Sequence, residues 1–218
     1  MGQANHSAPM LLGDTIGNFA ELVAEGTPTP GGGSVAAYSG LLATSLGRMM
    51  CNLTIGKKKY AQKETRIKEI NSELELLGGR LRELIDEDAA AFDQVLAAYR
   101  LPRGAEEQQT KRNREIVSAT LKSIRAPSEI SERALEVLRL LVELAAVGNT
   151  NVFPDLTTGS QLAAVAMKGS YYNITVNLKL LTDDEEVRDV RDRTVKIIAE
   201  AADLASALET EMLTYMIG

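Results

Sequence analysis

The stretch from residue 64 to residue 99 constrains the fold of this chain more than any other. Apolar side chains recur there every three or four positions without a break, which is the spacing of one face of a long amphipathic helix. The positions on this face are Ile67, Ile70, Leu74, Leu77, Leu81, Leu84, Asp88, Phe92, Val95 and Tyr99. No segment shows the sustained alternation of a β-strand. We therefore predict a single-domain all-α bundle of about six to eight helices.

A second helix, predicted from about residue 34 to residue 54, carries one charged side chain, Arg48. It is rich in alanine and glycine, which allow neighbouring helices to approach closely. Its serine and threonine content and its modest hydropathy favour a buried central helix over a membrane span. Apolar stripes predict further helices at residues 16–23, 130–145, 162–180 and 187–212, and another helix is expected at residues 105–124.

Local signals assign three helix starts. Ser34 follows three glycines and Ser128 follows a proline, so each is a predicted N-cap. Thr182 and Glu185 have the spacing of a capping box at the start of the last helix.

The composition limits the chemistry. A formal charge of −6 argues against nucleic acid as a partner. The single cysteine, Cys51, excludes an intramolecular disulfide, and with no signal-peptide pattern it predicts a cytoplasmic protein. The only histidine, His6, lies in residues 1–12, a predicted flexible tail ahead of a helical domain at residues 13–218. With one histidine and one cysteine we expect no metal site and no cofactor, so proton transfer falls to Asp, Glu, Lys or Tyr.

A glycine-rich loop and a lysine run flank the uncharged helix. Gly31 to Gly33 expose backbone N–H groups at the start of a helix, an arrangement that favours anions. Lys57 to Lys59 follow its other end. We interpret the two segments as pocket walls, although a lysine run is commonly a solvated helix end.

Two carboxylates are candidate site residues. Asp88 occupies a position of the stripe where Leu or Ile is expected. A buried carboxylate destabilises the fold unless it is paired, so Asp88 is a candidate site residue. The alternative is a slight rotation that lets Asp88 reach the edge of the stripe. Asp155 closes the amide-rich loop that begins at Gly148, and its alternative role is a helix cap.

Two amides lie among the apolar positions of a later helix. Asn173 and Asn177 are one turn apart beside the stripe at residues 162–180, where each amide needs a hydrogen-bond partner. That partner is either a ligand or the backbone of a helix.

Together these motifs resemble the cyclodeaminase/cyclohydrolase family of folate enzymes. The resemblance covers about residues 15 to 210 and rests on residues 28–37, 52–60, 88–92, 99, 126–127, 148–155, 173 and 177. It implies an all-α homodimer that binds tetrahydrofolate derivatives in a groove between its subunits. It also implies one of two activities. We favour methenyltetrahydrofolate cyclohydrolase, and formiminotetrahydrofolate cyclodeaminase is the alternative.

The resemblance assigns roles to individual residues. Asp155 is the expected general base, Asp88 is the other carboxylate of the site, and Lys57 is expected to neutralise folate carboxylates or polarise the forming formyl oxygen. The expected substrate-binding residues are Gly31, Gly32, Gly33, Ser34, Asn52, Lys58, Tyr60, Asn149, Asn151, Asn173 and Asn177.

The chain departs from the family pattern at two places. Pro154 precedes Asp155, which alters how the carboxylate is presented, and the bulky pair Tyr171-Tyr172 is expected to narrow the pocket. A helical adaptor without enzymatic activity is the remaining hypothesis. It is based on the long apolar stripe and on the scarcity of His, Cys and aromatic residues.

Overall fold

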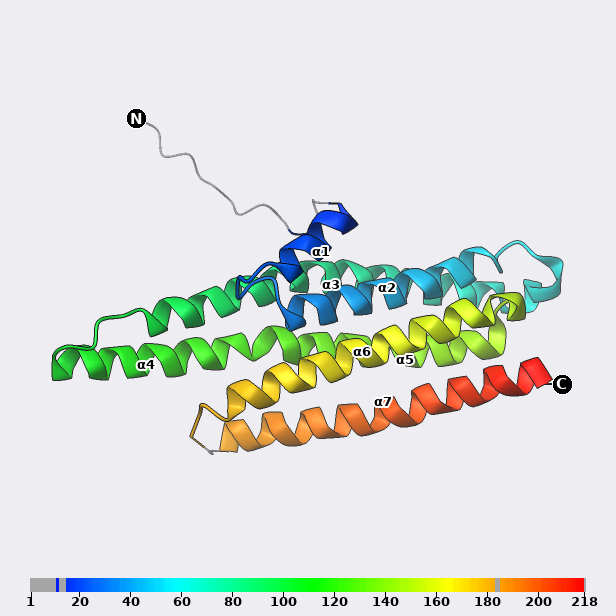
Figure 1. Cartoon of the computed structure of the whole chain (residues 1–218). Coiled ribbons are helices and arrows are strands. Elements are labelled where there is room, and N and C mark those ends of the chain that lie inside the picture. The colour runs from blue at the N-terminus through cyan, green and yellow to red at the C-terminus, as the bar shows by residue number, and fades with distance from the viewer. Residues whose placement is uncertain (1–10, 12–14, 183–184, 218) are drawn as a thin grey trace.

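The structure is a computed structural model that describes residue 11 and residues 15–182 and 185–217 (Figure 1). The described residues form helices and no strands, so the all-α prediction is confirmed. The α-helices are α1 (Ile16–Ala24), α2 (Gly32–Asn52), α3 (Glu64–Tyr99), α4 (Glu106–Ser123), α5 (Arg125–Val147), α6 (Phe153–Leu178) and α7 (Glu185–Ile217). Two short 3-10 helices, η2 (Lys58–Lys63) and η3 (Thr150–Val152), precede α3 and α6.

The long helices run side by side along one axis, and the short α1 lies across α2 and α3 (Figure 1). Helix α2 packs against α3, α5 and α6, and α7 covers α5 and α6 from outside. The predicted buried central helix is thus confirmed as α2. None of the described helices is long and apolar enough to cross a membrane.

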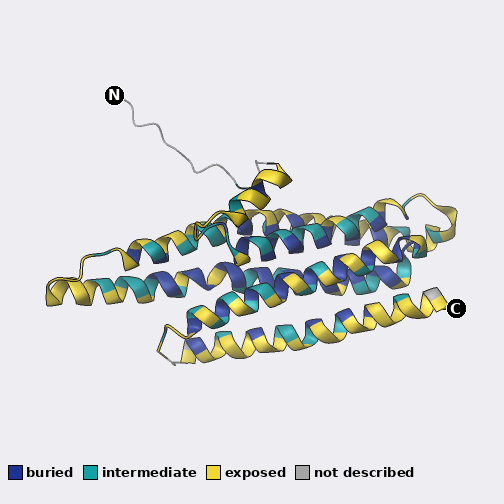
Figure 2. Cartoon of the chain, viewed as in Figure 1, coloured by how far each residue is buried: buried dark blue, intermediate teal, exposed yellow. Residues whose placement is uncertain are grey.

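Small residues in α2 let its neighbours approach closely. A Cβ atom added at Gly47 would lie 2.6 Å from a methyl carbon of Leu141 and 2.8 Å from one of Leu74, closer than real atoms approach. Helices α3 and α5 therefore pack against the α2 backbone itself at this level. The buried positions follow this contact along the centre of the bundle (Figure 2).

The predicted stripe of α3 faces the core. The residues that become fully enclosed are Ile67, Ile70, Leu74, Leu81 and Leu84. Asp88 and Phe92 are half-buried, and Tyr99 is exposed, with its ring beside the guanidinium of Arg112. Val95 is buried again, in a separate small cluster with Ala98 and with Ala119 of α4, so the stripe leaves the main core where α3 extends past the N-terminus of α2.

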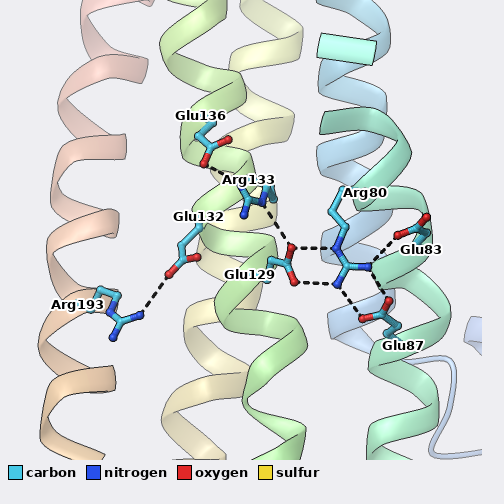
Figure 3. A network of polar contacts seen from close by, with 8 residues as sticks. All are labelled: Arg80, Glu83, Glu87, Glu129, Glu132, Arg133, Glu136 and Arg193. Carbon is cyan, nitrogen blue, oxygen red and sulfur yellow. Dashed lines mark hydrogen bonds and ion pairs between the residues drawn. The ribbon is translucent and has the colours of Figure 1, made fainter. Parts of the chain in front are cut away.

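Two arginines on α3 fix its register against α5. Arg66 donates to both carboxylate oxygens of Glu143 at 2.6 and 2.7 Å, and Arg80 donates to both oxygens of Glu129 at 2.8 Å (Figure 3). The interval between the arginines equals the interval between the glutamates, so the two antiparallel helices meet in the same register at both points. Each arginine also binds two glutamates of its own helix: Glu69, Glu73, Glu83 and Glu87.

Two of the predicted helix starts are wrong. Helix α2 begins at Gly32 with Gly31 before it, and the hydroxyl of Ser34 instead donates to the carbonyl oxygen of Ile85 at 3.0 Å. Helix α5 begins at Arg125, because Pro127 lies in its first turn, where no backbone N–H is required. Ser128 is therefore inside the helix. The predicted capping box of Thr182 and Glu185 spans residues 183–184, which lie outside the described residues, so it stays a prediction.

The predicted tail, residues 1–12, lies outside the described residues except for Leu11, and so does His6. Leu11 packs half-buried against the core, and its backbone N–H donates to a carboxylate oxygen of Asp86 at 2.8 Å. This contact attaches the chain to α3 before α1 begins.

Candidate functional site

The predicted site residues fall into two groups at opposite ends of α2. One group surrounds the N-terminus of α2, beside Asp88 and the second half of α6. The other surrounds its C-terminus, where Asn149 contacts Leu53 and Thr54 just before α6. At about 1.5 Å of rise per residue, Ser34 and Asn52 lie roughly 27 Å apart. One chain therefore cannot bring both groups to one small molecule.

A cavity of about 260 Å³ lies at the first end, bounded by the start of α2, by α3, by the α4–α5 junction and by α6. It brings together six predicted residues: Gly31, Gly32, Gly33, Asp88, Asn173 and Asn177. The remaining residues of its wall are Pro28, Thr29, Phe92, Ser123, Pro127, Tyr172 and Val176. The wall thus combines one carboxylate, two amides and several apolar groups.

Asp88 reaches this cavity across the first turn of α2. A methyl group at Gly33 would overlap both of its carboxylate oxygens, so only glycine leaves room for them. The hydroxyl of Ser34 lies 3.4 Å from Oδ2 of Asp88. The carboxylate therefore occupies the place of an N-cap, against the positive end of the α2 dipole.

The pKa of Asp88 is raised above its ordinary value. Burial is the largest cause, and hydrogen bonds from the hydroxyl and the backbone N–H of Ser34 act in the opposite direction. A carboxylate with a raised pKa beside an open cavity is well suited to accept a proton.

The two amides present hydrogen-bonding groups to the same cavity. Nδ2 of Asn173 donates to the carbonyl oxygen of Gly169 at 2.9 Å, which leaves its amide oxygen without a donor among the described residues. The side-chain amide of Asn177 forms no hydrogen bond with the described residues, although its backbone carbonyl accepts the N–H of Leu180 at 3.1 Å. The sequence left two partners open for these amides, a ligand or a helix backbone. The helix backbone accepts a hydrogen bond from the side-chain NH2 of Asn173, and it bonds neither side-chain group of Asn177. The unsatisfied amide atoms are available to a ligand.

Tyr172 stands at the edge of the cavity with 62% of its surface exposed, next to Val176 at 61%. Its ring packs against that of Tyr171, with the two centroids 5.7 Å apart. Of the bulky tyrosine pair, Tyr172 is the one that lines the cavity.

The second group lies around the C-terminus of α2. Lys57 and Lys58 are exposed, and the ring of Tyr60 lies 5.2 Å from the Nζ atom of Lys59. The Tyr60 hydroxyl is 3.5 Å from the side-chain oxygen of Asn149. Lysines and a phenol can thus act on a ligand at this end.

Asn149 is buried, and the chain itself uses its polar groups. Its backbone N–H donates to the hydroxyl of Thr54 at 3.0 Å, and its side-chain amide donates to the carbonyl oxygen of Leu53 at 3.3 Å. The side-chain oxygen accepts the N–H of Asn151 at 3.3 Å. These bonds join the loop before α6 to the end of α2.

Besides Lys57 and Lys58, three further predicted residues of this group are exposed: Asn52, Asn151 and Asp155. Asp155 does not lie in a loop, as the sequence indicated, but in the first turn of α6. The helix starts at Phe153 because Pro154 is tolerated in a first turn. Asn52, the last residue of α2, accepts a hydrogen bond from the side chain of Asn71 at 3.3 Å.

Sequence reasoning missed part of the cavity wall. Thr29 and Pro127 lie in motifs that carry the family resemblance but were not named as site residues, and Ser123 comes from a segment with no signal of a site. Thr29 is held there by a hydrogen bond of 3.1 Å from its hydroxyl to Asp93. The described residues contain no cluster of His, Cys, Asp or Glu with the arrangement of a metal site.

The chain is thus an all-α protein with a cavity at the glycine-rich start of a central helix, lined by a carboxylate and two amides. The family model "Formiminotransferase-cyclodeaminase" matches residues 15–196. The chain belongs to this family.

Two relatives differ in how much of their length the chain covers. The methenyltetrahydrofolate cyclohydrolase of Methylorubrum extorquens is 35% identical over 195 residues, which span 89% of this chain and 94% of the relative. The formimidoyltransferase-cyclodeaminase of Rattus norvegicus is 28% identical over 191 residues, which span 88% of this chain and 35% of the relative. The chain therefore corresponds to about a third of that longer protein.

A solved structure has the same fold. The crystal structure of formiminotetrahydrofolate cyclodeaminase from Thermotoga maritima superimposes with a TM-score of 0.77 and 25% sequence identity. The match covers 94% of this chain and 98% of the other.

Proposed function

We propose that this protein is a methenyltetrahydrofolate cyclohydrolase, which hydrolyses 5,10-methenyltetrahydrofolate to 10-formyltetrahydrofolate. The observation that carries the proposal is the 35% identity to a protein with this name, over 94% of that protein's length. The cavity at Asp88 supports it, because it offers a carboxylate and amides to a cationic heterocycle.

The reaction needs only water and proton transfer. Water adds to the electrophilic carbon of the amidinium cation, a carboxylate takes the proton that the water loses, and a tetrahedral adduct forms. The adduct hydroxyl then loses its proton to form the carbonyl as the bond from this carbon to N5 breaks, N5 takes up the proton held by the carboxylate, and the carbon remains on N10 as the formyl group. One proton is released per turnover. A carboxylate near the reacting carbon stabilises the cation before the attack.

We assign the proton-accepting role to Asp88 rather than to Asp155. Asp88 faces a cavity, and burial raises its pKa, which makes its carboxylate a stronger base than an exposed one. Asp155 is exposed in the first turn of α6, at the far end of α2 from this cavity. The preference for Asp155 came from a loop that the structure replaces with a helix.

We propose that two copies combine their opposite ends to complete each site. Helix α6 exposes Val165, Tyr172 and Val176, and α2 leaves Val35 and Met49 half-exposed. A two-fold axis perpendicular to α2 would place the Asp88 cavity of one copy beside the Lys57 end of its partner. This arrangement joins the two groups that lie roughly 27 Å apart within one chain. In it, the partner's Lys57 and Lys58 neutralise the carboxylates of the substrate.

The cyclodeaminase activity is the second candidate function. It is favoured by the structural likeness to the Thermotoga maritima protein and by the sequence similarity to the longer formimidoyltransferase-cyclodeaminases. These relatives are named as enzymes, so the alternative of a helical adaptor has no support from the comparisons.

We also propose that the protein works in the cytoplasm and needs neither a metal ion nor a nucleotide. The support is the single buried cysteine and a reaction that needs no electrophile beyond the substrate cation.

The test follows both substrates in parallel. Purified protein is mixed with methenyltetrahydrofolate while the loss of its near-ultraviolet absorbance is recorded, and with formiminotetrahydrofolate while ammonia is measured. We expect rapid loss of absorbance and little ammonia. Ammonia release that exceeds methenyl hydrolysis would assign the chain to the cyclodeaminases, and no turnover of either substrate would refute both.

A further inference from the structure

A larger cavity, of about 770 Å³, lies on the other side of the α4–α5 junction from the Asp88 cavity. It is bounded by α4, α5, the end of α6 and the start of α7. Lys122 and Ile124 line this groove, whereas the intervening Ser123 lines the Asp88 cavity. The two cavities are therefore separate, and the proposed function leaves the larger one unused.

The carboxylates of this groove already have partners. Glu129 binds Arg80 through both of its oxygens at 2.8 Å, and Glu132 lies 3.5 Å from Arg193 of α7 (Figure 3). Neither glutamate is thus free to neutralise a further cation.

Three cations of the groove have no such partner. Arg114, Lys122 and Arg125 line it and are exposed, and no hydrogen bond or ion pair joins their side chains to the described residues. They produce a local surplus of positive charge on a chain with a formal charge of −6. A surplus of one sign in a concave site attracts a ligand of the opposite sign.

The floor of the groove is apolar, and it contains one unsatisfied polar atom. Ile124, Leu178 and Val187 are at most 5% exposed and form a small cluster of their own, separate from the main core. The hydroxyl oxygen of Ser128, another lining residue, is enclosed and has no hydrogen-bond partner. Because this oxygen is enclosed, a ligand in the groove would meet the apolar floor and not the Ser128 hydroxyl.

We propose that this groove binds a small organic anion with an apolar body, such as an aryl or acyl carboxylate, sulfonate or phosphate. The apolar part rests on Ile124 and Leu178, and the anionic group meets Lys122 and Arg125. This site is independent of Asp88 and of the proposed function.

The test uses 8-anilino-1-naphthalenesulfonate, titrated by calorimetry and by its fluorescence. N-phenyl-1-naphthylamine, which has the same rings without the sulfonate, is the neutral comparison. We expect saturable binding of the sulfonate at one site per chain and much weaker binding of the amine. Arg125→Glu and Lys122→Glu should each lower the affinity for the sulfonate about tenfold or more, equivalent to the loss of one charged hydrogen bond.

Arg82→Glu is the matched control, because Arg82 is an exposed cation of α3 and the substitution changes the net charge equally. Arg82→Glu should leave the affinity for the sulfonate within about twofold of the wild-type value. Equal affinity for Arg125→Glu and Arg82→Glu would overturn the proposal. Equal binding of the sulfonate and the amine would overturn it as well, because it would show that the groove does not recognise the charge.

Discussion

The carboxylate of Asp88 lies against the backbone of Gly33, in the space that a side chain at position 33 would fill. This contact joins two features that the sequence presents separately, a carboxylate in an apolar stripe and a run of glycines before a helix. The glycine provides the room, the first turn of α2 provides the donors, and burial keeps the carboxylate in contact with both. The position of Asp88 therefore depends on Gly33.

Replacing Gly33 with alanine should displace the carboxylate and reduce both activity and stability. We expect Gly33→Ala to lower the free energy of unfolding by about 1 to 3 kcal/mol, the usual cost of overpacking, and to lower turnover of methenyltetrahydrofolate. Gly79→Ala is the control, because nothing lies within 4 Å of a Cβ atom there. It should stabilise α3 by up to about 1 kcal/mol. Denaturant titration measures the free energy of unfolding, and the absorbance assay measures turnover. A Gly33→Ala variant as active and as stable as the wild type would contradict the contact between Gly33 and Asp88.

The raised pKa of Asp88 predicts a pH dependence. A group whose pKa is higher in the folded state contributes stability below its unfolded pKa, and this contribution is lost as pH rises through the folded pKa. Asp88→Asn should therefore gain stability relative to the wild type as pH rises above about 4, the ordinary pKa of an aspartate, measured by thermal unfolding. If Asp88 is the base, kcat/KM of the wild type should fall as pH drops through the same raised pKa.

Cys51 should be inert in the folded protein. Its thiol is fully enclosed in α2, and burial raises its pKa to about 11, so the reactive thiolate is scarce at neutral pH. We expect a thiol reagent such as dithionitrobenzoate to label the only cysteine on unfolding and not before. Rapid and complete labelling of the native protein would mean that α2 is not the buried centre of the bundle.

Mixing two inactive variants should restore activity if each site uses residues from both copies. An Asp88→Asn chain and a Lys57→Ala chain each lack one half of every site in their own dimers. In a mixed dimer, one of the two sites has both wild-type residues. Random exchange makes about half of the dimers mixed, so about a quarter of the wild-type turnover should return. No gain over the separate variants, in a preparation where exchange is demonstrated, would place all essential groups in one chain.

The sequence predicted the helices well, because apolar periodicity records which face of each helix is buried. It failed at Ser34 and Ser128, where capping propensity was overridden by the carboxylate of Asp88 in one case and by Pro127 in a first turn in the other. It also missed the matched spacing of Arg66 and Arg80, a repeat of charges rather than of apolar residues.

The candidate site was predicted in part. Asp88, Asn173 and Asn177 were found because a polar residue in an apolar stripe needs a partner, and they do line one cavity. The sequence could not show that Asp155 lies at the other end of α2, because that depends on the antiparallel packing of α2 and α6. Ser123, at the end of α4, carried no signal of its own.

Turnover of methenyltetrahydrofolate by two matched variants tests the central claim most directly. Asp88→Asn and Asp155→Asn each remove one negative charge and keep the shape of the side chain. We predict that Asp88→Asn lowers kcat by about a hundredfold or more, the usual scale for general acid-base catalysis, in a protein that remains folded. Asp155→Asn should retain most of the wild-type rate. The reverse result, with Asp155→Asn inactive and Asp88→Asn near normal, would contradict the assignment of the base to the Asp88 cavity.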